Sequence, residues 1–394
     1  MSIVTIPREI QLLIFGQLRV VDLVRLSETC RRLKDVARDP SLWKKLTLTY
    51  ERIKNKNEAC RNHVRRCSSL REVDITGDTG EKKSIRSDKI MTVVMKAKNT
   101  LTSINFSPSL AGLSNTSFKL IGEMTQLTYL AVGGRKLEPE GISALARLTE
   151  LRTLKVPGIE CGKYSSQDNE ILMAKLVDLF SKLMKLEQVE IQMENNFPSD
   201  EVVRSLLNNN PNLHHLDITP WSHFHLGSYY DNTYRDIDVL SSRSLILIAD
   251  KCPQLTHIGI GHLESFSDTT ITKLVTKCPK LKHANFEETD FSNSALAMMS
   301  RNCPDLEYLN ITGCELVTEE ALERFADPAT AANLKHLCIS KCFYSPQLPD
   351  RLKQNLPHAT IVIDDYEDTS DEDYDYGDNY SDNEEDEEGH CSLM

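Results

Sequence analysis

A leucine-based pattern recurs through most of this chain and restricts its possible folds more than any other feature. The pattern L-x-x-[LIVA]-x-[IVF] begins at Leu70, Leu101, Leu127, Leu151, Leu186, Leu213, Leu255, Leu281, Leu306 and Leu334. The last three intervals are 26, 25 and 28 residues, and the earlier ones range from 24 to 42. Spacings of this size indicate stacked supersecondary units, each of which buries its apolar face against its neighbours.

Each copy of the pattern predicts a short strand, with buried positions such as Leu306, Leu309 and Ile311. An amphipathic helix separates it from the next copy, as at residues 268–278. A strand, a crossover helix and a second strand imply parallel pairing. The predicted fold is therefore α/β, a curved leucine-rich-repeat solenoid with parallel strands inside and helices outside.

Cysteines mark the later copies of the pattern. Cys252, Cys278 and Cys303 are each followed by Pro-x-Leu at the start of a strand. Cys314 and Cys342 each come three residues after a strand's last buried position. This arrangement resembles the cysteine-containing leucine-rich repeats found behind F-boxes. The thiols are expected to be reduced and to fill the same core position in successive turns.

The first fifty residues contain three short helical patterns. The first spans residues 7–18 and has Ile10, Leu13 and Ile14 on one face, and the second follows Asp22, an expected N-cap. Three such helices bury little apolar surface among themselves. Their remaining apolar face either docks on the rest of the chain or binds a partner.

The same segment resembles an F-box in the order and spacing of its residues. The resemblance covers I-P-R-E-I-Q-L-L-I-F-G-Q-L at 6–18, D-L-V-R-L at 22–26, C-R-R-L at 30–33 and L-W-K-K-L at 42–46. It implies docking on a Skp-type adaptor, which bridges to cullin and RING subunits. It assigns the interface and its supporting core to Pro7, Ile10, Leu13, Ile14, Leu18, Leu23, Leu26 and Leu33.

One residue of each predicted strand points away from the core, so these residues form a column across the sheet. The column contains Tyr129, Thr153, Gln188, His215, His257, His283, Tyr308 and His336. The simplest interpretation is a solvated polar row. Our hypothesis is a substrate-binding surface with pH-sensitive charge, formed by His215, His257, His283, Tyr308 and His336.

An insertion at residues 220–244 interrupts the repeats and is rich in aromatic residues, including Trp221, Tyr229 and Tyr230. Insertions in solenoids often lie on the binding face, and exposed aromatic side chains favour interfaces. The insertion is expected either to contribute Trp221, Tyr229 and Tyr230 to substrate binding or to fold back over the array.

The C-terminal segment is strongly acidic. Residues 364–394 contain fifteen Asp and Glu and no Lys or Arg, and without them the net charge of −12 becomes +3. The rest of the chain is thus nearly balanced, and no nucleic-acid partner is expected. The tail is expected to be disordered. Its last four residues, Cys391-Ser-Leu-Met, fit a C-a-a-X box and make Cys391 a candidate farnesylation site.

Several classes of protein are disfavoured. No run approaches the roughly 18 apolar residues that cross a bilayer, and no signal-peptide core is present. The expected location is the cytoplasm and also the nucleus, with membrane association if Cys391 is farnesylated. The fingerprints of common hydrolases and nucleotide-binding enzymes are missing from the sequence. No cofactor is expected, and zinc at Cys60, His63 and Cys67 is the weaker alternative.

The predicted organisation is an F-box at 1–49, a leucine-rich-repeat solenoid at 50–362 and a disordered acidic tail at 363–394. The resemblance implies a non-catalytic substrate-recognition subunit of an SCF-type ubiquitin ligase. Such a subunit would hold a protein substrate for ubiquitination and proteasomal degradation. The alternative is a non-catalytic F-box and leucine-rich-repeat interaction scaffold that is prenylated and tethered to a membrane.

Overall fold

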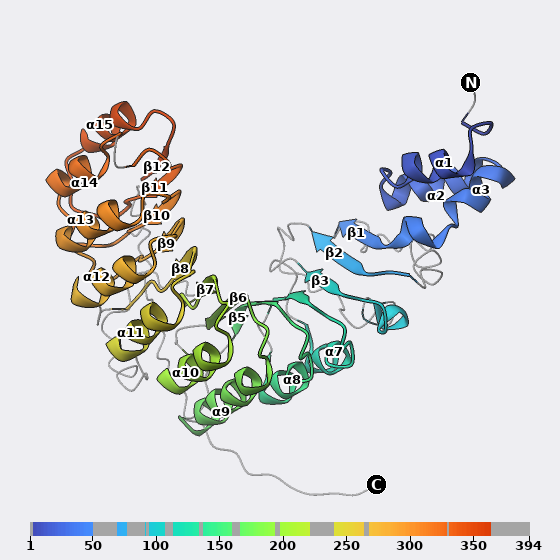
Figure 1. Ribbon diagram of the computed structural model, residues 1–394, viewed down its shortest axis with the longest axis horizontal. Coiled ribbons are helices and arrows are strands. Elements are labelled where there is room, and N and C mark those ends of the chain that lie inside the picture. The colour runs from blue at the N-terminus through green and yellow to red at the C-terminus, as the bar shows by residue number, and fades with distance from the viewer. Residues whose placement is uncertain are drawn as a thin grey trace, which may run out of the picture. The chain divides into compact units, whose positions relative to one another are not determined.

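The computed structural model describes eleven parts of the chain. They are residues 3–49, 69–76, 91, 94–106, 113–133, 137–159, 166–193, 198–220, 240–263, 268–328 and 331–363. All of them lie in the first of two units into which the chain divides, residues 1–363. In the first unit a group of helices precedes a parallel sheet that helices cover on one side (Figure 1).

Short helices around a small apolar core form the N-terminal head. Its elements are α1 (Arg8–Phe15), α2 (Val20–Thr29), α3 (Arg31–Ala37) and the 3-10 turn η1 (Pro40–Trp43). The buried side chains include Phe15, Leu23, Leu33 and Trp43. The Trp43 indole N–H donates to the carbonyl oxygen of Ala37 at 2.7 Å, which attaches η1 to the end of α3.

Two details of the head differ from the sequence-based prediction. Helix α1 ends at Phe15 and not at Leu18, because Gly16 follows it and glycine disfavours helix continuation. Helix α2 begins before Asp22, so Asp22 lies in its first turn and not at the N-cap. There it forms an ion pair with Arg19 at 2.9 Å. A negative charge is favourable in the first turn of a helix because of the helix dipole.

Twelve strands form one parallel sheet in chain order within the described residues. They are β1 (Lys45–Thr49), β2 (Glu72–Thr76), β3 (Ser103–Phe106), β4 (Tyr129–Ala131), β5 (Thr153–Ile159), β6 (Gln188–Met193), β7 (His215–Asp217), β8 (His257–Gly259), β9 (His283–Asn285), β10 (Tyr308–Asn310), β11 (His336–Cys338) and β12 (Thr360–Val362). The ten predicted strands are present, as β2 to β11. The first strand, β1, comes from the segment predicted as F-box, so the head leads directly into the sheet.

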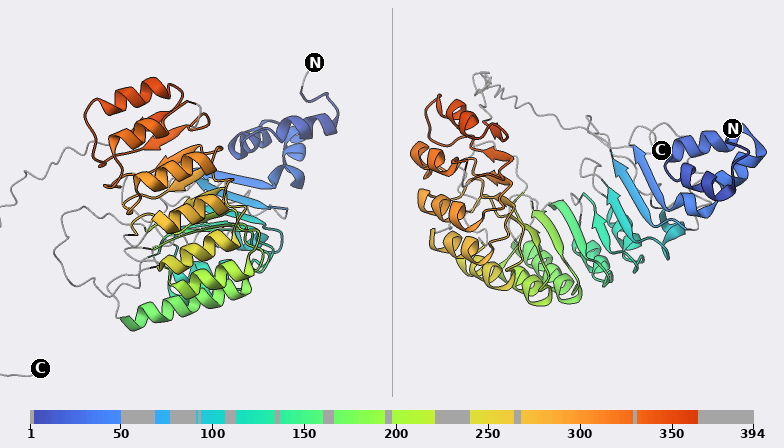
Figure 2. Two further views of the ribbon diagram at one scale, coloured as in Figure 1. Left: turned by 60° about the vertical axis from the view of Figure 1, so that its left-hand side comes forward. Right: turned by 45° about the horizontal axis from the view of Figure 1, so that its top comes forward.

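The described helices cover one side of the sheet, and the opposite side of the sheet is called the inner face below (Figure 2). The covering elements are η2 (Met95–Ala97), α7 (Asn115–Ile121), α8 (Pro139–Leu145), α9 (Ser166–Lys182), α10 (Asp200–Asn209), α11 (Ser242–Lys251), α12 (Asp268–Lys277), α13 (Asn293–Asn302), α14 (Glu319–Phe325) and α15 (Leu348–Asn355). Helix α12 confirms the helix predicted at residues 268–278. The predicted parallel-strand solenoid is therefore confirmed.

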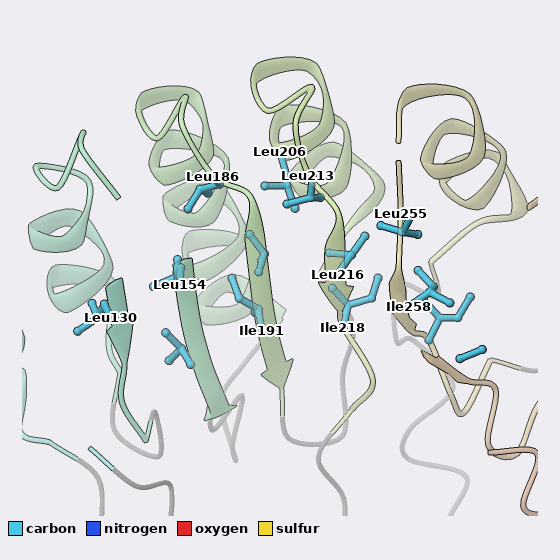
Figure 3. Close-up of a cluster of buried hydrophobic side chains, with 14 of the residues drawn as sticks. Leu130, Leu154, Leu186, Ile191, Leu206, Leu213, Leu216, Ile218, Leu255 and Ile258 are labelled. Carbon is cyan, nitrogen blue, oxygen red and sulfur yellow. The ribbon is translucent and has the colours of Figure 1, made fainter. Parts of the chain in front are cut away.

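The pattern leucines fill the layer between sheet and helices (Figure 3). Leu154, Leu216 and Ile258 point from strands β5, β7 and β8 toward the helix layer, to which α10 contributes Leu206, and all four are at most 2% exposed. Fully burying a side chain of this size stabilises a fold by about 1.5–3 kcal/mol. Because each unit closes its core against the next, the stability of the array is shared between neighbours.

Polar residues at the helix N-termini also link successive repeats. Asp200, the first residue of α10, accepts hydrogen bonds from the backbone N–H of Ser241 at 2.9 Å and from the hydroxyl of Ser244 at 2.6 Å. Ser241 is the N-cap of the following helix, α11. Asp268 accepts from the hydroxyl of Ser292 at 2.7 Å in the same way, between α12 and α13. These bonds fix the spacing of adjacent helices.

Replacing Asp200 with alanine is expected to cost about 1–3 kcal/mol of unfolding free energy, because it removes a charged acceptor from several donors. Burial raises the pKa of Asp200, but the Ser241 and Ser244 bonds outweigh it and hold that pKa below 3.8. The difference from wild type should thus be full above pH 3.8 and vanish at lower pH. Urea unfolding across this range measures it. Asp178→Ala, which removes only an exposed pair with Lys182, is the control and should cost under about 0.5 kcal/mol.

Candidate binding surfaces on the head and the inner face

One face of α1 is apolar and exposed. Ile10, Leu13 and Ile14 are 46%, 68% and 41% exposed, and their spacing of three and four residues places them on one side of the helix. Ile3, which precedes α1, is also exposed. The opposite face of the helix buries Phe15 in the head. The head therefore presents an apolar stripe that its own core does not cover.

The structure divides the predicted adaptor-binding residues into two groups. Pro7, Ile10, Leu13 and Ile14 lie on the surface of the head. Leu23 and Leu33 are buried, and Leu18 and Leu26 are half-buried against the same core. The first group can touch a partner. The second group supports the helices that carry it.

Two polar contacts fix α1 in place. The buried Gln11 side chain donates to the carbonyl oxygen of Ile3 at 2.7 Å, which holds the segment before the helix. Arg8 forms an ion pair with Asp39 at 2.8 Å, and Asp39 also caps η1 by accepting from Ser41. The Arg8 and Ser41 bonds lower the pKa of Asp39, so it is ionised at neutral pH. The apolar stripe is thus held on a rigid helix.

The predicted column on the inner face forms a stack of rings. The centroid distances are 4.8 Å for His215–His257, 5.4 Å for His257–His283 and 4.0 Å for His283–Tyr308, all with stacked planes. His336 continues the row at 6.2 Å from Tyr308, with a tilted ring. The strand register places these residues opposite one another, which confirms that they form one column. We call the first four residues the ring stack.

The central histidines of the ring stack are uncharged at neutral pH. Burial, followed by His215 and His283, lowers the pKa of His257 to about 4. Burial also lowers the pKa of His283. The expectation of pH-sensitive charge near neutrality is therefore wrong for His257. Stacking places cationic forms beside one another and away from water, and this penalises protonation.

A network of charges borders the ring stack at β6. Glu190 bonds to His215 at 2.8 Å and to Lys155. Burial raises the pKa of Glu190, but these two partners outweigh it and bring that pKa to about 2. Glu190 is therefore ionised at neutral pH, and both partners contact its Oε1.

The repeat cysteines pack in the core, as the sequence predicts. Cys252, Cys278, Cys303 and Cys314 are buried, and burial raises the pKa of each thiol to about 12. In the described part of the chain, no group of three or more His, Cys, Asp or Glu could hold a metal ion. These thiols therefore act as small apolar groups.

At pH 8, a thiol with a pKa of about 12 is ionised in roughly one molecule in 10⁴. Cys252, Cys278, Cys303 and Cys314 should thus remain unmodified when the native protein is treated with iodoacetamide, while the exposed Cys30 reacts. Peptide mass spectrometry with and without denaturant measures this. Alkylation of the four at the rate of Cys30 in the native protein would contradict their burial.

Several predicted residues lie outside the described parts of the chain. They are Trp221, Tyr229, Tyr230, Cys391 and the alternative zinc ligands Cys60, His63 and Cys67. Among the helices that are described, none combines the length and the apolarity needed to span a bilayer.

The fold and the exposed helix together define a leucine-rich-repeat protein with an F-box-like head. Residues 3–49 match the F-box-like family. The chain is 33% identical over 70 residues to the F-box protein SKIP1 of Arabidopsis thaliana, covering 18% of this chain and 23% of that protein. It is 30% identical over 69 residues to F-box/LRR-repeat protein 5 of Mus musculus, covering 17% and 10%. The N-terminal region is therefore an F-box-like domain homologous to that of F-box/LRR-repeat protein 5.

These sequence matches span less than a quarter of the length of either relative. A solved structure extends the comparison to the array. The crystal structure of the Rad7 and Elc1 complex in yeast contains a chain with a TM-score of 0.51 to this one. The two share 13% identity, with 90% of this chain and 92% of that chain covered. At this identity the similarity is one of fold.

Proposed function

We propose that this chain is the substrate-recognition subunit of an SCF-type ubiquitin ligase. The apolar stripe of α1 binds a Skp-type adaptor, which connects the chain to cullin and RING subunits. The inner face of the array holds a protein substrate. The chain contributes position and no chemistry of its own, since holding a substrate near a ubiquitin-charged enzyme raises its effective concentration there. Ubiquitination and proteasomal degradation of the substrate follow.

The exposed stripe of α1 carries this proposal. Eight large hydrophobic side chains are exposed in the described residues, and four of them, Ile3, Ile10, Leu13 and Ile14, belong to the head. A concentration of exposed apolar side chains on one short helix is typical of a protein–protein contact. Its position within the F-box-like match makes a Skp-type adaptor the expected partner. The fold likeness to a chain in the yeast Rad7 and Elc1 complex supports a protein partner.

The alternative function is an interaction scaffold that uses the same adaptor contact without promoting ubiquitin transfer. It is favoured by the C-a-a-X pattern at Cys391, which would tether the chain to a membrane when prenylated. The acidic residues before Cys391 oppose stable binding to an anionic leaflet, and one lipid chain alone anchors weakly. For these reasons we favour the ligase subunit.

Affinity capture of the full chain from cells, with and without proteasome inhibition, tests the proposal. The ligase function predicts that the Skp-type adaptor and cullin are both recovered, and that substrates accumulate when the proteasome is inhibited. His257→Ala with His283→Ala should lose the accumulated substrates and keep the adaptor. Recovery of the adaptor without cullin would favour the scaffold instead.

A further inference from the structure

A second column of side chains runs along the inner face beside the ring stack. It lies two residues further along each strand and contains Lys155, Glu190, Asp217, Gly259, Asn285 and Asn310. Residues two apart in a strand point to the same side, so this column and the ring stack form one surface. Its composition decides what that surface can bind.

Strand β8 contributes no side chain to the second column. A Cβ at Gly259 would lie 2.6 Å from the carboxyl carbon of Asp217, and a Cβ at Gly261 would lie 2.9 Å from the backbone oxygen of Glu287. Only glycine fits at such distances. The Asp217 carboxylate of β7 therefore lies over β8, on the same side of that strand as the His257 ring.

Two carboxylates on this surface lack a cationic partner. Asp217 accepts from the backbone N–H of Thr219 at 3.0 Å and from the Gln192 amide at 3.2 Å. Glu287, which follows β9, accepts from the Asn310 amide at 3.1 Å. Every one of these donors is neutral. Among the residues that the structure describes, no ion pair involves Asp217 or Glu287.

Two other carboxylates in the part of the array from β5 to β10 have cationic partners. Glu190 pairs with Lys155 and His215, and Glu307, at the edge of the sheet, pairs with Lys282 at 3.4 Å and with Lys335. Asp217 and Glu287 thus differ from Glu190 and Glu307, whose negative charge is compensated by neighbouring side chains.

Both unpaired carboxylates act on the ring stack. Burial is the main cause that raises the pKa of the Tyr308 hydroxyl. Cys338, Glu287 and Asp217 raise it further. His262 is also influenced by Glu287, but it bonds to Glu288 at 2.9 Å. The rings cover one another's faces, so their edges border the inner face. A neutral imidazole presents one nitrogen as a hydrogen-bond acceptor.

We propose that the ring stack together with Asp217 and Glu287 binds an arginine or lysine side chain of an extended protein segment. The surface offers the carboxylate oxygens of Asp217 and Glu287 and one acceptor nitrogen on each of the uncharged rings of His257 and His283. Arginine and lysine carry donors only, and their positive charge complements the two unpaired carboxylates. The planar guanidinium of arginine suits several acceptors at once better than an ammonium group does. This inference rests on the proposed function, in which the inner face holds the substrate.

Selection of a random dodecapeptide library against the immobilised full chain tests the inference. The library is the probe, and the selected peptides should be enriched in arginine and lysine over the naive library. Replacing the common basic residue of one selected peptide with citrulline or glutamine should weaken binding about tenfold, since a charge-assisted hydrogen bond is lost. The same replacement should weaken binding less than about twofold to the chain carrying Asp217→Asn and Glu287→Gln.

Glu307→Gln provides the control, because it removes a carboxylate next to β10 that already has two lysine partners. It should keep the full tenfold preference for the basic peptide. Selected peptides without basic enrichment, or an equal loss with the double variant, would overturn the inference. In that case substrate loss on His257→Ala with His283→Ala would still support the proposed function. Failure of the adaptor to bind would contradict the proposed function. The peptide experiment would then still test separately whether Asp217 and Glu287 bind a basic side chain.

Discussion

The full chain carrying Leu13→Asp and Ile14→Glu is expected to bind a Skp-type adaptor at least about 100-fold more weakly than wild type. Fully burying a leucine or isoleucine side chain contributes about 1.5–3 kcal/mol, and a 100-fold loss of affinity corresponds to about 2.7 kcal/mol. The substitutions place charges on the apolar stripe that would have to be desolvated. Isothermal titration of the purified chain with the adaptor measures the change.

The fold should survive these substitutions because neither side chain belongs to the buried core of the head: Leu13 is 68% exposed and Ile14 is 41% exposed. The unfolding midpoint should therefore stay close to that of wild type. Met184→Asp is the matched control: this side chain is 61% exposed but lies in the array between α9 and β6. It should leave adaptor affinity within twofold. Equal affinity for wild type and the double variant would show that the adaptor does not use α1.

Replacing Phe286 with alanine is expected to cost about 3–5 kcal/mol, the usual range for removing a buried aromatic side chain. Phe286 is fully buried and stacks on Phe291 at a centroid distance of 5.3 Å. Its backbone N–H donates to Asn310 and its carbonyl accepts from the Cys314 thiol, so it joins the repeats of β9 and β10. In a solenoid each repeat is held by its neighbours, so the loss should be local.

Hydrogen exchange with mass spectrometry measures where the protection is lost. The region from β9 to β12 should exchange faster in the Phe286→Ala variant, whereas α1 to α3 keep their protection and adaptor affinity stays within twofold. Phe343→Ala is the control, since that ring is 68% exposed, and it should cost less than about 0.5 kcal/mol. Uniform loss of protection over the head and the array would contradict the local transmission of stability.

The array was predictable because its residues repeat. A buried leucine before each strand and two buried positions within it specify the period, and the structure places strands at all ten copies. The outer strands β1 and β12 do not follow the pattern. Leu46 was assigned to the head because it completes the F-box string, but β1 pairs with β2 through the register Leu46–Val73. Backbone pairing between two strands that are more than twenty residues apart in the sequence leaves no local signal.

The sequence predicted which residues form the head, but not which of them are exposed for a partner and which are buried in its core. Ile10 and Leu23 are both apolar residues of short helices, and only packing shows that the first is exposed and the second is buried. The ring stack followed from strand alternation alone. The low pKa of His257 did not, because it depends on burial and on the stacking of neighbouring rings.

The acceptor surface at Asp217 and Glu287 was not predicted either. Asp217 shares its column with Glu190, and both read as ordinary acidic residues in the sequence. Their difference arises from partners that are distant in the chain: Lys155 neutralises Glu190, whereas Asp217 meets only neutral donors. A glycine at the third position of β8 was the available signal, since every neighbouring strand from β5 to β10 has a polar side chain there.

Reconstitution from purified components tests the adaptor assignment most directly. The full chain, a Skp-type adaptor and a cullin–RING pair are mixed and analysed by size-exclusion chromatography with light scattering. An F-box-like head that presents α1 to the adaptor predicts a single complex containing one copy of each component, and Leu13→Asp with Ile14→Glu should release the chain from it. The assignment would be contradicted if the adaptor, cullin and RING subunit assembled and the wild-type chain eluted separately from their complex.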